Sequence, residues 1–173
     1  MKQKFKVGDK LMLVKTPNMS WDYWAEQDKI SVGDVITVDK VSDESLDDGC
    51  AVAVMSEGGI YWQDASSFKL IAPDRIVIVL RRASDDRTIR RELEKLGFTW
   101  ASGNNPTTMS YFEKHKCRVL ILDSKSKRLY YDYSGSRLNL NRLKDKEIKR
   151  GGIILNTRPS VTNVVNELKR YLS

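Results

Sequence analysis

Three arginines at helical spacing form the pattern that points most directly to a ligand. Arg87, Arg90 and Arg91 stand at positions i, i+3 and i+4, so a helix places them on one face. Long cationic side chains on an exposed face contact phosphates, and each contact releases a counterion. We therefore expect these arginines to be exposed and to bind a polyanion. The alternative is a solvated helix surface on which neighbouring glutamates pair with the arginines.

Positive charge is concentrated in the second half of the chain. Residues 75–173 contain 22 Lys and Arg against 10 Asp and Glu, whereas residues 1–74 contain 8 against 13. The formal charge of +7 for the whole chain therefore hides two parts of opposite sign. Because only the second part attracts a polyanion, we expect nucleic acid, in the first place duplex DNA, to bind there. The candidate contact residues are Arg81, Arg82, Arg87, Arg90, Arg91, Lys95, Arg137, Arg142, Lys144, Lys149 and Arg150.

Tyrosines beside these basic segments offer a second kind of contact. Tyr130, Tyr131 and Tyr133 lie on one predicted strand, where alternation sends Tyr130 to one face and the other two to the opposite face. Exposed rings could stack on single-stranded bases, although tyrosines also fill half-buried sheet positions. The hydroxyl-rich segment 99–112 could donate hydrogen bonds to phosphate, or it could be a long connection held by Trp100 in the core.

Aromatic residues with acidic neighbours stand out in the first part of the chain. Such rings could line a groove that takes a basic peptide of a protein partner, since acidic residues at 22, 26, 28 and 64 surround them. The alternative is that they close the core of a small barrel. The candidate partner-binding residues are Trp21, Tyr23, Trp24, Tyr61 and Trp62.

Catalytic and metal-binding patterns find little support. His115 stands between lysines, and Cys50 and Cys117 are far apart and not at a metal-binding spacing. Asp123 and Asp132 on neighbouring predicted strands could meet and hold Mg²⁺ as in a nuclease, although aspartates are common beside turns. The sequence therefore favours a non-enzymatic protein without a metal or a cofactor.

Short strands separated by turns are predicted in the first seventy residues. Two Val-Gly-Asp sequences, at 7–9 and 32–34, each place a glycine, which tolerates positive φ, before a β-branched run. Gly58-Gly59 predicts a hairpin turn. Five short strands in this length indicate a small, bent barrel. The predicted strands are 11–15, 35–41, 50–55, 60–62 and 66–71.

The second half alternates strands with helices, and Pro73-Asp74 marks the boundary. The apolar run 75–80 is typical of a strand buried on both faces. Apolar stripes predict one helix that begins at the N-cap Ser84 and ends before Gly97, and another that begins after Ser160. This order predicts an α+β domain of two layers, with helices on one face of an antiparallel or mixed sheet. The further strands are predicted at 117–122, 128–133 and 152–155.

The first part of the chain resembles small SH3-like barrels of the KOW and Tudor kind. The resemblance covers residues 4–72 and rests on the sequence Phe-Lys-Val-Gly-Asp-Lys at 5–10, the second Val-Gly-Asp, Gly-Ile-Tyr-Trp at 59–62 and Phe-Lys-Leu at 68–70. It implies an SH3-like barrel at residues 1–72. Members of this family bind RNA, DNA or proteins, so the resemblance does not select among these ligands.

The second part carries a further resemblance. Residues 97–103, Gly-Phe-Thr-Trp-Ala-Ser-Gly, are similar to a feature of small α/β domains encoded by bacteriophages. An SH3-like domain joined to a basic domain, here residues 75–173, resembles the MotB-type early proteins of T4-like phages. The resemblance implies a non-enzymatic, sequence-nonspecific DNA-binding accessory protein that modulates transcription. The alternative is a host-directed inhibitor that binds a host protein or sequesters a nucleotide signal.

Hydropathy gives an expectation about localisation. No run of about eighteen apolar residues is present, and the first residues lack the apolar core of a signal peptide. We therefore expect a protein that lies in the cytoplasm of the host cell and has no membrane partner.

Overall fold

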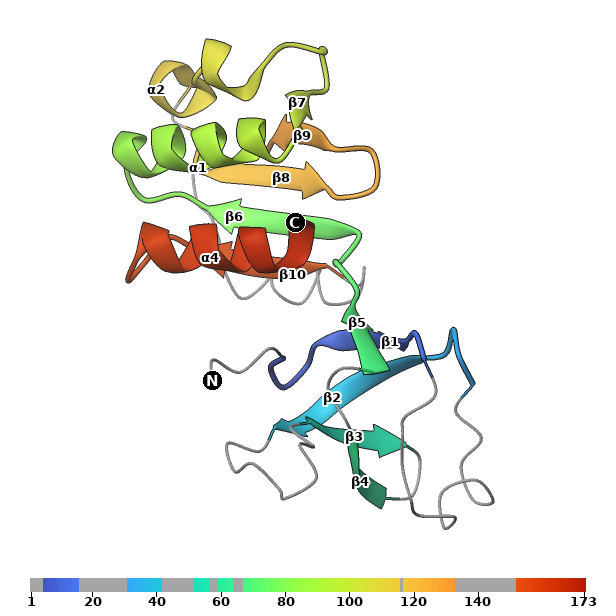
Figure 1. Ribbon diagram of the computed structural model, residues 1–173. Coiled ribbons are helices and arrows are strands. Elements are labelled where there is room, and N and C mark those ends of the chain that lie inside the picture. The colour runs from blue at the N-terminus through green and yellow to red at the C-terminus, as the bar shows by residue number, and fades with distance from the viewer. Residues whose placement is uncertain are drawn as a thin grey trace. The chain divides into compact units, whose positions relative to one another are not determined.

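A computed structural model describes residues 5–15, 31–41, 52–56, 59–63, 67–115, 117–132 and 152–173. The chain divides into two compact units, unit 1 (Met1–Ile71) and unit 2 (Ala72–Ser173) (Figure 1). This division lies beside the predicted boundary at Pro73-Asp74. Together the units make an α+β protein, with helices described only in unit 2. Within the described residues, no helix is both long and apolar enough to cross a membrane.

Unit 1 contains an antiparallel sheet in which each strand pairs with neighbours in the order β4-β3-β2-β1-β5. The edge strands β4 and β5 are not paired with each other among the described residues. The sheet is therefore open there and does not show the closed barrel that the sequence predicts. Its strands are β1 (Lys10–Leu13), β2 (Val35–Val41), β3 (Val52–Ser56), β4 (Gly59–Gln63) and β5 (Phe68–Leu70).

The two Val-Gly-Asp sequences form matching turns before β1 and β2. Gly8 and Gly33 adopt φ angles of 86° and 103°, which side chains disfavour. In each turn the aspartate carboxylate accepts a hydrogen bond from the backbone N–H three residues earlier. The distance is 2.8 Å from Lys6 to Asp9 and 2.7 Å from Ser31 to Asp34. The predicted role of these sequences as turns is therefore confirmed.

Unit 2 contains a mixed sheet in the order β10-β6-β8-β9-β7 (Figure 1). The pairs β6–β8 and β8–β9 are antiparallel, whereas β10 and β7 run parallel to their neighbours β6 and β9. The strands are β6 (Arg75–Val79), β7 (Thr99–Trp100), β8 (Val119–Asp123), β9 (Arg128–Tyr131) and β10 (Ile153–Asn156).

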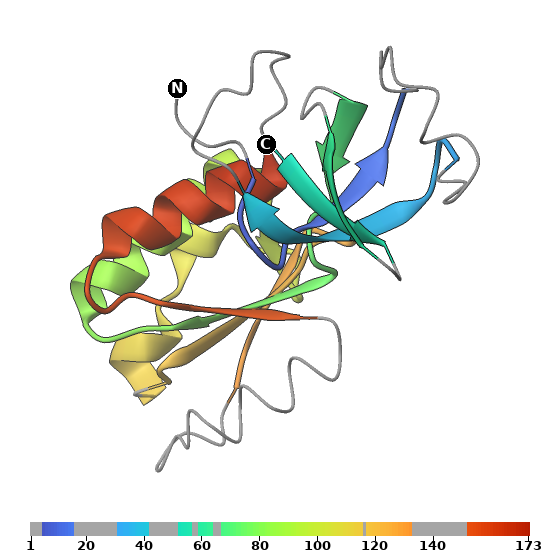
Figure 2. The ribbon, with the colours of Figure 1, turned by 90° about the horizontal axis from the view of Figure 1, so that it is seen from below.

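Two long helices, α1 and α4, contact each other and lie side by side on one face of this sheet (Figure 2). Their apolar stripes are buried, with Ile89 and Leu93 of α1 and Leu168 of α4 wholly inaccessible. A 3-10 helix and a short helix follow β7 and contact α1. The helices are α1 (Ala83–Lys95), η3 (Pro106–Thr108), α2 (Tyr111–His115) and α4 (Val161–Leu172).

The helix termini agree in part with the prediction. Gly97 adopts a φ of 80° after the C-cap of α1, and Ser160 is the N-cap of α4, as expected. The N-cap of α1 is Arg82 and not Ser84, which lies inside the first turn. The reason is that Asp85 accepts a hydrogen bond from the Arg82 backbone N–H at 3.2 Å, which fixes the start two residues earlier.

Strand β6 is buried on both faces, which confirms the prediction from its apolar run. Ile76 and Ile78 belong to the main core, which the helices cover. Val77 belongs to a second buried cluster with Val119 and Ile121 of β8. Because side chains alternate along a strand, the two clusters lie on opposite faces of the sheet.

Candidate nucleic-acid interface

The middle arginine of the predicted basic face is buried. Arg90 is 4% exposed, whereas the side chain of Arg87 is 59% exposed. The prediction that all three arginines are exposed is therefore wrong for Arg90. The reason is that η3 packs on α1, and the carbonyl oxygen of Pro106 accepts a hydrogen bond from Arg90 Nη1 at 2.8 Å.

A buried carboxylate holds Arg90 in this position. Asp86 is wholly inaccessible, and its Oδ2 accepts hydrogen bonds from Arg90 Nε at 2.9 Å and Ser110 Oγ at 2.8 Å. Its Oδ1 accepts a hydrogen bond from the Tyr131 hydroxyl at 2.7 Å. These contacts compensate the cost of burying a charge. They also join α1 to the connection between η3 and α2 and to β9, three segments that are distant in the sequence.

The Tyr131 hydroxyl is fixed as a donor in this network. Its burial, together with the negative charge of Asp86, raises the pKa of Tyr131 far above its usual range. The hydroxyl therefore keeps its proton and donates a hydrogen bond to the carboxylate. This polar network lies beside the main apolar core, to which Tyr131 also belongs.

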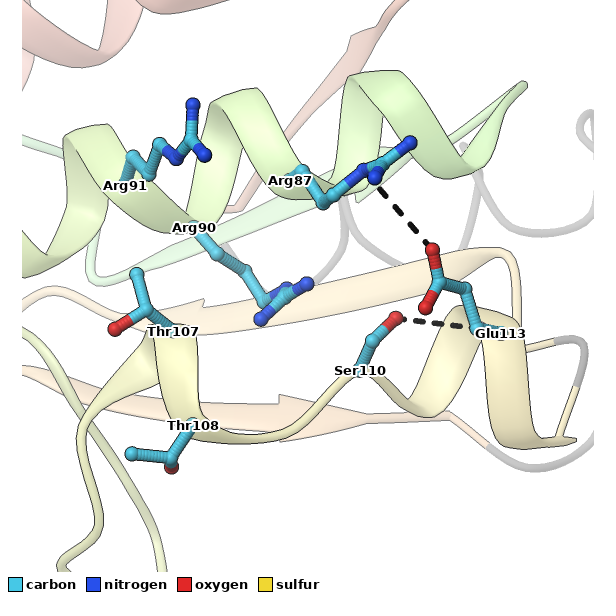
Figure 3. Close-up of a pocket in the computed structure, with 7 residues that line it drawn as sticks. All are labelled: Arg87, Arg90, Arg91, Thr107, Thr108, Ser110 and Glu113. Carbon is cyan, nitrogen blue, oxygen red and sulfur yellow. Dashed lines mark hydrogen bonds and ion pairs between the residues drawn. The ribbon is translucent and has the colours of Figure 1, made fainter.

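The three arginines still border one pocket, of about 340 Å³, between α1 and the segment that runs from η3 to α2 (Figure 3). Figure 3 shows the Arg90 side chain pointing from α1 towards this segment, with Arg87 directed at Glu113. We call this site the arginine pocket. It is lined by Arg87, Arg90, Arg91, Thr107, Thr108, Ser110 and Glu113.

The charges in the arginine pocket are unequally compensated. Asp86 neutralises Arg90, whereas Arg87 Nε lies 4.0 Å from Glu113 Oε1, at the limit of an ion pair, and both side chains are more than half exposed. The exposed Arg91 side chain makes no ion pair or hydrogen bond with any residue that the structure describes. An anion entering the pocket would therefore compete with Glu113 for Arg87, whereas Arg91, at the border of the pocket, has no competing acceptor among the described residues.

The hydroxyl groups around the pocket are committed to the protein. Thr107 Oγ1 donates to Glu94 at 2.9 Å, and Thr108 Oγ1 donates to the Asn105 carbonyl oxygen at 2.7 Å. Ser110 Oγ, which donates to Asp86, also accepts a hydrogen bond from the Glu113 backbone N–H at 3.2 Å. Residues 107–110 of the polar segment therefore shape the pocket wall, and the hydroxyl protons of Thr107, Thr108 and Ser110 are already used within unit 2.

The remaining predicted cations near α1 differ in their surroundings. Arg81 and Arg82 are exposed immediately before the helix. Lys95 Nζ lies 2.7 Å from Glu92 Oε1, and Lys169 of α4 lies 3.2 Å from the other oxygen of the same carboxylate. Hydrogen bonds from these two lysines lower the pKa of Glu92. Lys95 is thus partly compensated, whereas Arg91 has no such contact within the described residues.

Several candidate residues lie outside the part of the chain that the structure describes, so their predicted roles stay predictions. For Tyr61 and Trp62 the structure describes only the backbone, which belongs to β4. The candidate residues that lie wholly outside the described part of the chain are Arg137, Arg142, Lys144, Lys149, Arg150, Trp21, Tyr23 and Trp24.

An aromatic cluster lies next to the buried network. The Trp100 and Tyr131 rings stack with their centroids 4.9 Å apart, and the Tyr111 ring meets Trp100 edge-on at 5.6 Å. Tyr130 is 42% exposed, whereas Tyr131 is buried, which confirms the predicted alternation. We call the adjoining space, of about 190 Å³, the aromatic pocket. It is lined by Trp100, Ala101, Ser102, Tyr111, Leu129, Tyr130 and Tyr131.

Sequence reasoning missed the residues that organise both pockets. Asp86 stands four residues before Arg90, the spacing of a helical ion pair, so this contact could have been anticipated. No local signal indicates that Ser110 and Tyr111 approach α1 and β9, because that proximity arises from the path of the chain between β7 and β8. Trp100 is buried, in agreement with its predicted place in the core.

Asp123 and Asp132 do not meet. In the β8–β9 hairpin, Asp123 pairs with Arg128 beside the turn, whereas the Asp132 N–H bonds the Val119 carbonyl oxygen at the opposite end. The expectation that they could share Mg²⁺ is therefore wrong. Asp123 instead accepts hydrogen bonds from the Ser126 and Lys125 backbone N–H groups, which lower its pKa. No group of three metal-ligating side chains is present among the described residues.

Comparison with known proteins adds no relative from which a function could be transferred. No protein-family model matches the chain, and neither a curated protein nor a solved structure gives a significant match. Functional inference therefore rests on the residues and geometry described above.

Proposed function

We propose that this chain is a non-enzymatic nucleic-acid-binding protein and that unit 2 contacts the phosphates without reading base sequence. The observation that carries this proposal is the arginine pocket, which is bordered by the exposed and incompletely compensated side chains of Arg87 and Arg91. Guanidinium groups bind phosphate oxygens through charge-assisted hydrogen bonds. Arg81 and Arg82 extend the exposed cationic surface towards the start of α1.

The buried network supports this role because it places the pocket on rigid elements. Asp86 fixes Arg90, and Arg90 in turn holds the Pro106 carbonyl group, so the opposite wall of the pocket is tied to α1. A preorganised site loses less conformational entropy when it binds. In this proposal Arg90 positions the wall, and the exposed arginines on either side contact the phosphates.

Salt dependence tests the proposal with the full chain. Phosphate contacts release counterions, so affinity for duplex DNA should fall steeply and log-linearly as salt rises. Fluorescence anisotropy with two duplexes of unrelated sequence, each titrated at several salt concentrations, measures this slope. Equal slopes for the two sequences are expected. Affinity that does not change with salt would contradict phosphate binding and favour an inhibitor that acts on a protein.

A double variant tests which cations contribute. Arg87→Ala with Arg91→Ala should reduce the magnitude of the log K against log salt slope by up to about 2, because each lost phosphate contact removes about 0.9. The matched control is Lys10→Ala with Lys69→Ala, which removes the same charge from exposed positions of unit 1. If both variants change the slope equally, net charge alone drives binding, and the arginine pocket is not the site.

The resemblance to MotB-type phage proteins supports the broader biological role. We infer a phage-encoded accessory protein that modulates transcription while bound to DNA. For unit 1, the strand order β4-β3-β2-β1-β5 supports an SH3-like assignment, and its predicted role is contact with a host protein. Transcription from DNA templates with and without the protein, using the double arginine variant as the control, tests this role.

A further inference from the structure

We infer that unit 2 has a second phosphate contact at one end of its sheet, where three exposed arginines, Arg81, Arg118 and Arg158, flank the ends of neighbouring strands. This inference rests on the proposed function and adds a further contact surface to it. The three residues belong to distant segments of the sequence, so no local pattern groups them. Strand pairing brings them together, and we call them the sheet-end arginines.

Hydrogen bonds place the sheet-end arginines at the same end of the sheet, across the neighbouring strands β10, β6 and β8 (Figure 1). The Leu80 N–H, directly after β6, bonds the carbonyl oxygen of Arg118, directly before β8, at 2.8 Å. On the other side of β6, the Arg81 N–H bonds Oγ1 of Thr157, directly after β10, at 3.1 Å. Arg158 is the next residue along the chain. The three arginines therefore begin from adjacent backbone positions.

A buried threonine fixes this arrangement. Thr157 is 4% exposed, and its Oγ1, which accepts the hydrogen bond from the Arg81 N–H, donates one to Asp85 Oδ2 at 2.9 Å. Thr157 therefore ties the end of β10 both to the end of β6 and to the first turn of α1. Because the backbone beneath the arginines is fixed, a ligand would have to order only their side chains.

Positive charge at this end of the sheet is incompletely compensated. None of the sheet-end arginines makes a side-chain hydrogen bond or ion pair with any residue that the structure describes, and Arg82 beside them is also exposed. Two carboxylates stand near them, Asp85 in the first turn of α1 and Asp132 directly after β9. The Asp85 carboxylate already accepts hydrogen bonds from Thr157 and from the Arg82 N–H. The arginines outnumber these two carboxylates, so this end attracts anions.

The chemistry of these side chains suits a phosphate group. Neighbouring strands lie about 4.8 Å apart, so long side chains that begin on adjacent strands can reach the same anion. A guanidinium group donates two parallel hydrogen bonds to phosphate oxygens. Contacts of this kind hold the sugar-phosphate backbone without reading bases, in keeping with the proposed binding without base-sequence preference.

Variants with matched charge test the sheet-end arginines in the full chain. Arg118→Gln with Arg158→Gln removes two cations and keeps polar side chains. It should reduce the magnitude of the log K against log salt slope for duplex DNA by up to about 2, because each lost phosphate contact removes about 0.9. The control is Lys125→Gln with Lys169→Gln, which removes the same charge from exposed positions beyond the other end of β8 and on α4.

A conservative pair of variants separates lost charge from disturbed structure. Arg118→Lys with Arg158→Lys keeps both cations and should retain most of the wild-type slope. A loss as large as that of the glutamine pair would overturn the inference, because it would not come from charge.

The proposed function and this inference fail on different results. If the wild-type chain does not bind duplex DNA, or binds it without salt dependence, the proposed function fails. If the wild type binds with a steep slope, but the glutamine pair and the lysine control change that slope equally, only the contact at the sheet end is overturned.

Discussion

Units 1 and 2 use carboxylates in different ways. In unit 1, Asp9 and Asp34 each close a turn through the backbone N–H three residues earlier. In unit 2, Asp86 joins Arg90 of its own helix to Ser110 and Tyr131, which lie 24 and 45 residues further along the chain. The first use is local and can be recognised in the sequence. The second builds a site from distant segments, so its loss should affect both stability and the shape of the pocket.

The substitution Asp86→Ala is expected to give the largest difference in stability between the two units. The substitution leaves Arg90 buried without its ion-pair partner and should lower the free energy of unfolding of unit 2 by about 3–5 kcal/mol. Hydrogen exchange of β8 and β9 amides measures this change separately from unit 1. Asp86→Asn, which keeps the shape and one acceptor, serves as the control and should cost less. If Asp86→Ala lowered the free energy of unfolding no more than an Asp9 variant does, the distinction between local and long-range carboxylates would be refuted.

Tyr131→Phe tests the same network through its pH dependence. Because the pKa of Tyr131 is raised in the folded chain, its contribution to stability is complete below about pH 10 and is lost as pH rises above that value. The wild type should lose about 1.4 kcal/mol more per pH unit above pH 10 than the variant. Near pH 7 the variant should be less stable by about 1.5–3 kcal/mol, since it loses a hydrogen bond to a carboxylate. Urea unfolding between pH 7 and 11 gives both values, and parallel pH profiles would contradict this role of Tyr131.

A smaller effect is expected from Asp9→Ala in unit 1. The variant loses the hydrogen bond that the Lys6 N–H donates and should reduce stability by about 1 kcal/mol, as for a lost capping residue. Asp34→Ala makes the same change at the exposed turn and should cost less, because solvent can replace the carboxylate there. Thermal unfolding followed by signals of β1 and β2 measures both, and a larger loss in Asp34→Ala would refute the argument from burial.

The smallest effect is expected from Glu92→Gln, which weakens a partly exposed contact between α1 and α4. The pKa of Glu92 is lowered in the folded chain, so its stabilisation is present above about pH 4.5 and is lost as pH falls below that value. The variant should be less stable at pH 7 by a few tenths of a kcal/mol, as for surface ion pairs, and equal to the wild type near pH 3. Calorimetry at the two pH values tests this, and a constant difference would point to packing as the cause.

Local patterns predicted most of the elements in unit 2. The apolar run of β6 and the stripes of α1 and α4 lie where periodicity placed them, and Gly97 and Ser160 stand at the expected helix ends. The prediction was less accurate at the start of α1, where a cap two residues earlier competes with Ser84. For unit 1 the sequence predicted the strands and turns, but closure of the barrel requires pairing between distant edge strands, and that pairing is not seen among the described residues.

For the candidate site, the sequence predicted the positive charge but not the arrangement of the side chains. Helical spacing correctly brings Arg87, Arg90 and Arg91 to one pocket, because periodicity reports which side chains share a face of a helix. Periodicity does not report which segment covers that face. The segment around Pro106 covers it, and the Pro106 carbonyl oxygen accepts a hydrogen bond from Arg90. One of three arginines that look equivalent in the sequence is therefore buried and supports the pocket.

The sequence by itself determined the contrast between an acidic first part and a basic second part, together with the elements that local hydrophobic periodicity specifies. The tertiary structure alone decided that Asp86 is buried and that Trp100, Tyr111 and Tyr131 meet. The physical reason is that charge and periodicity are properties of neighbouring residues. Burial and pocket shape depend on contacts between segments that only folding brings together.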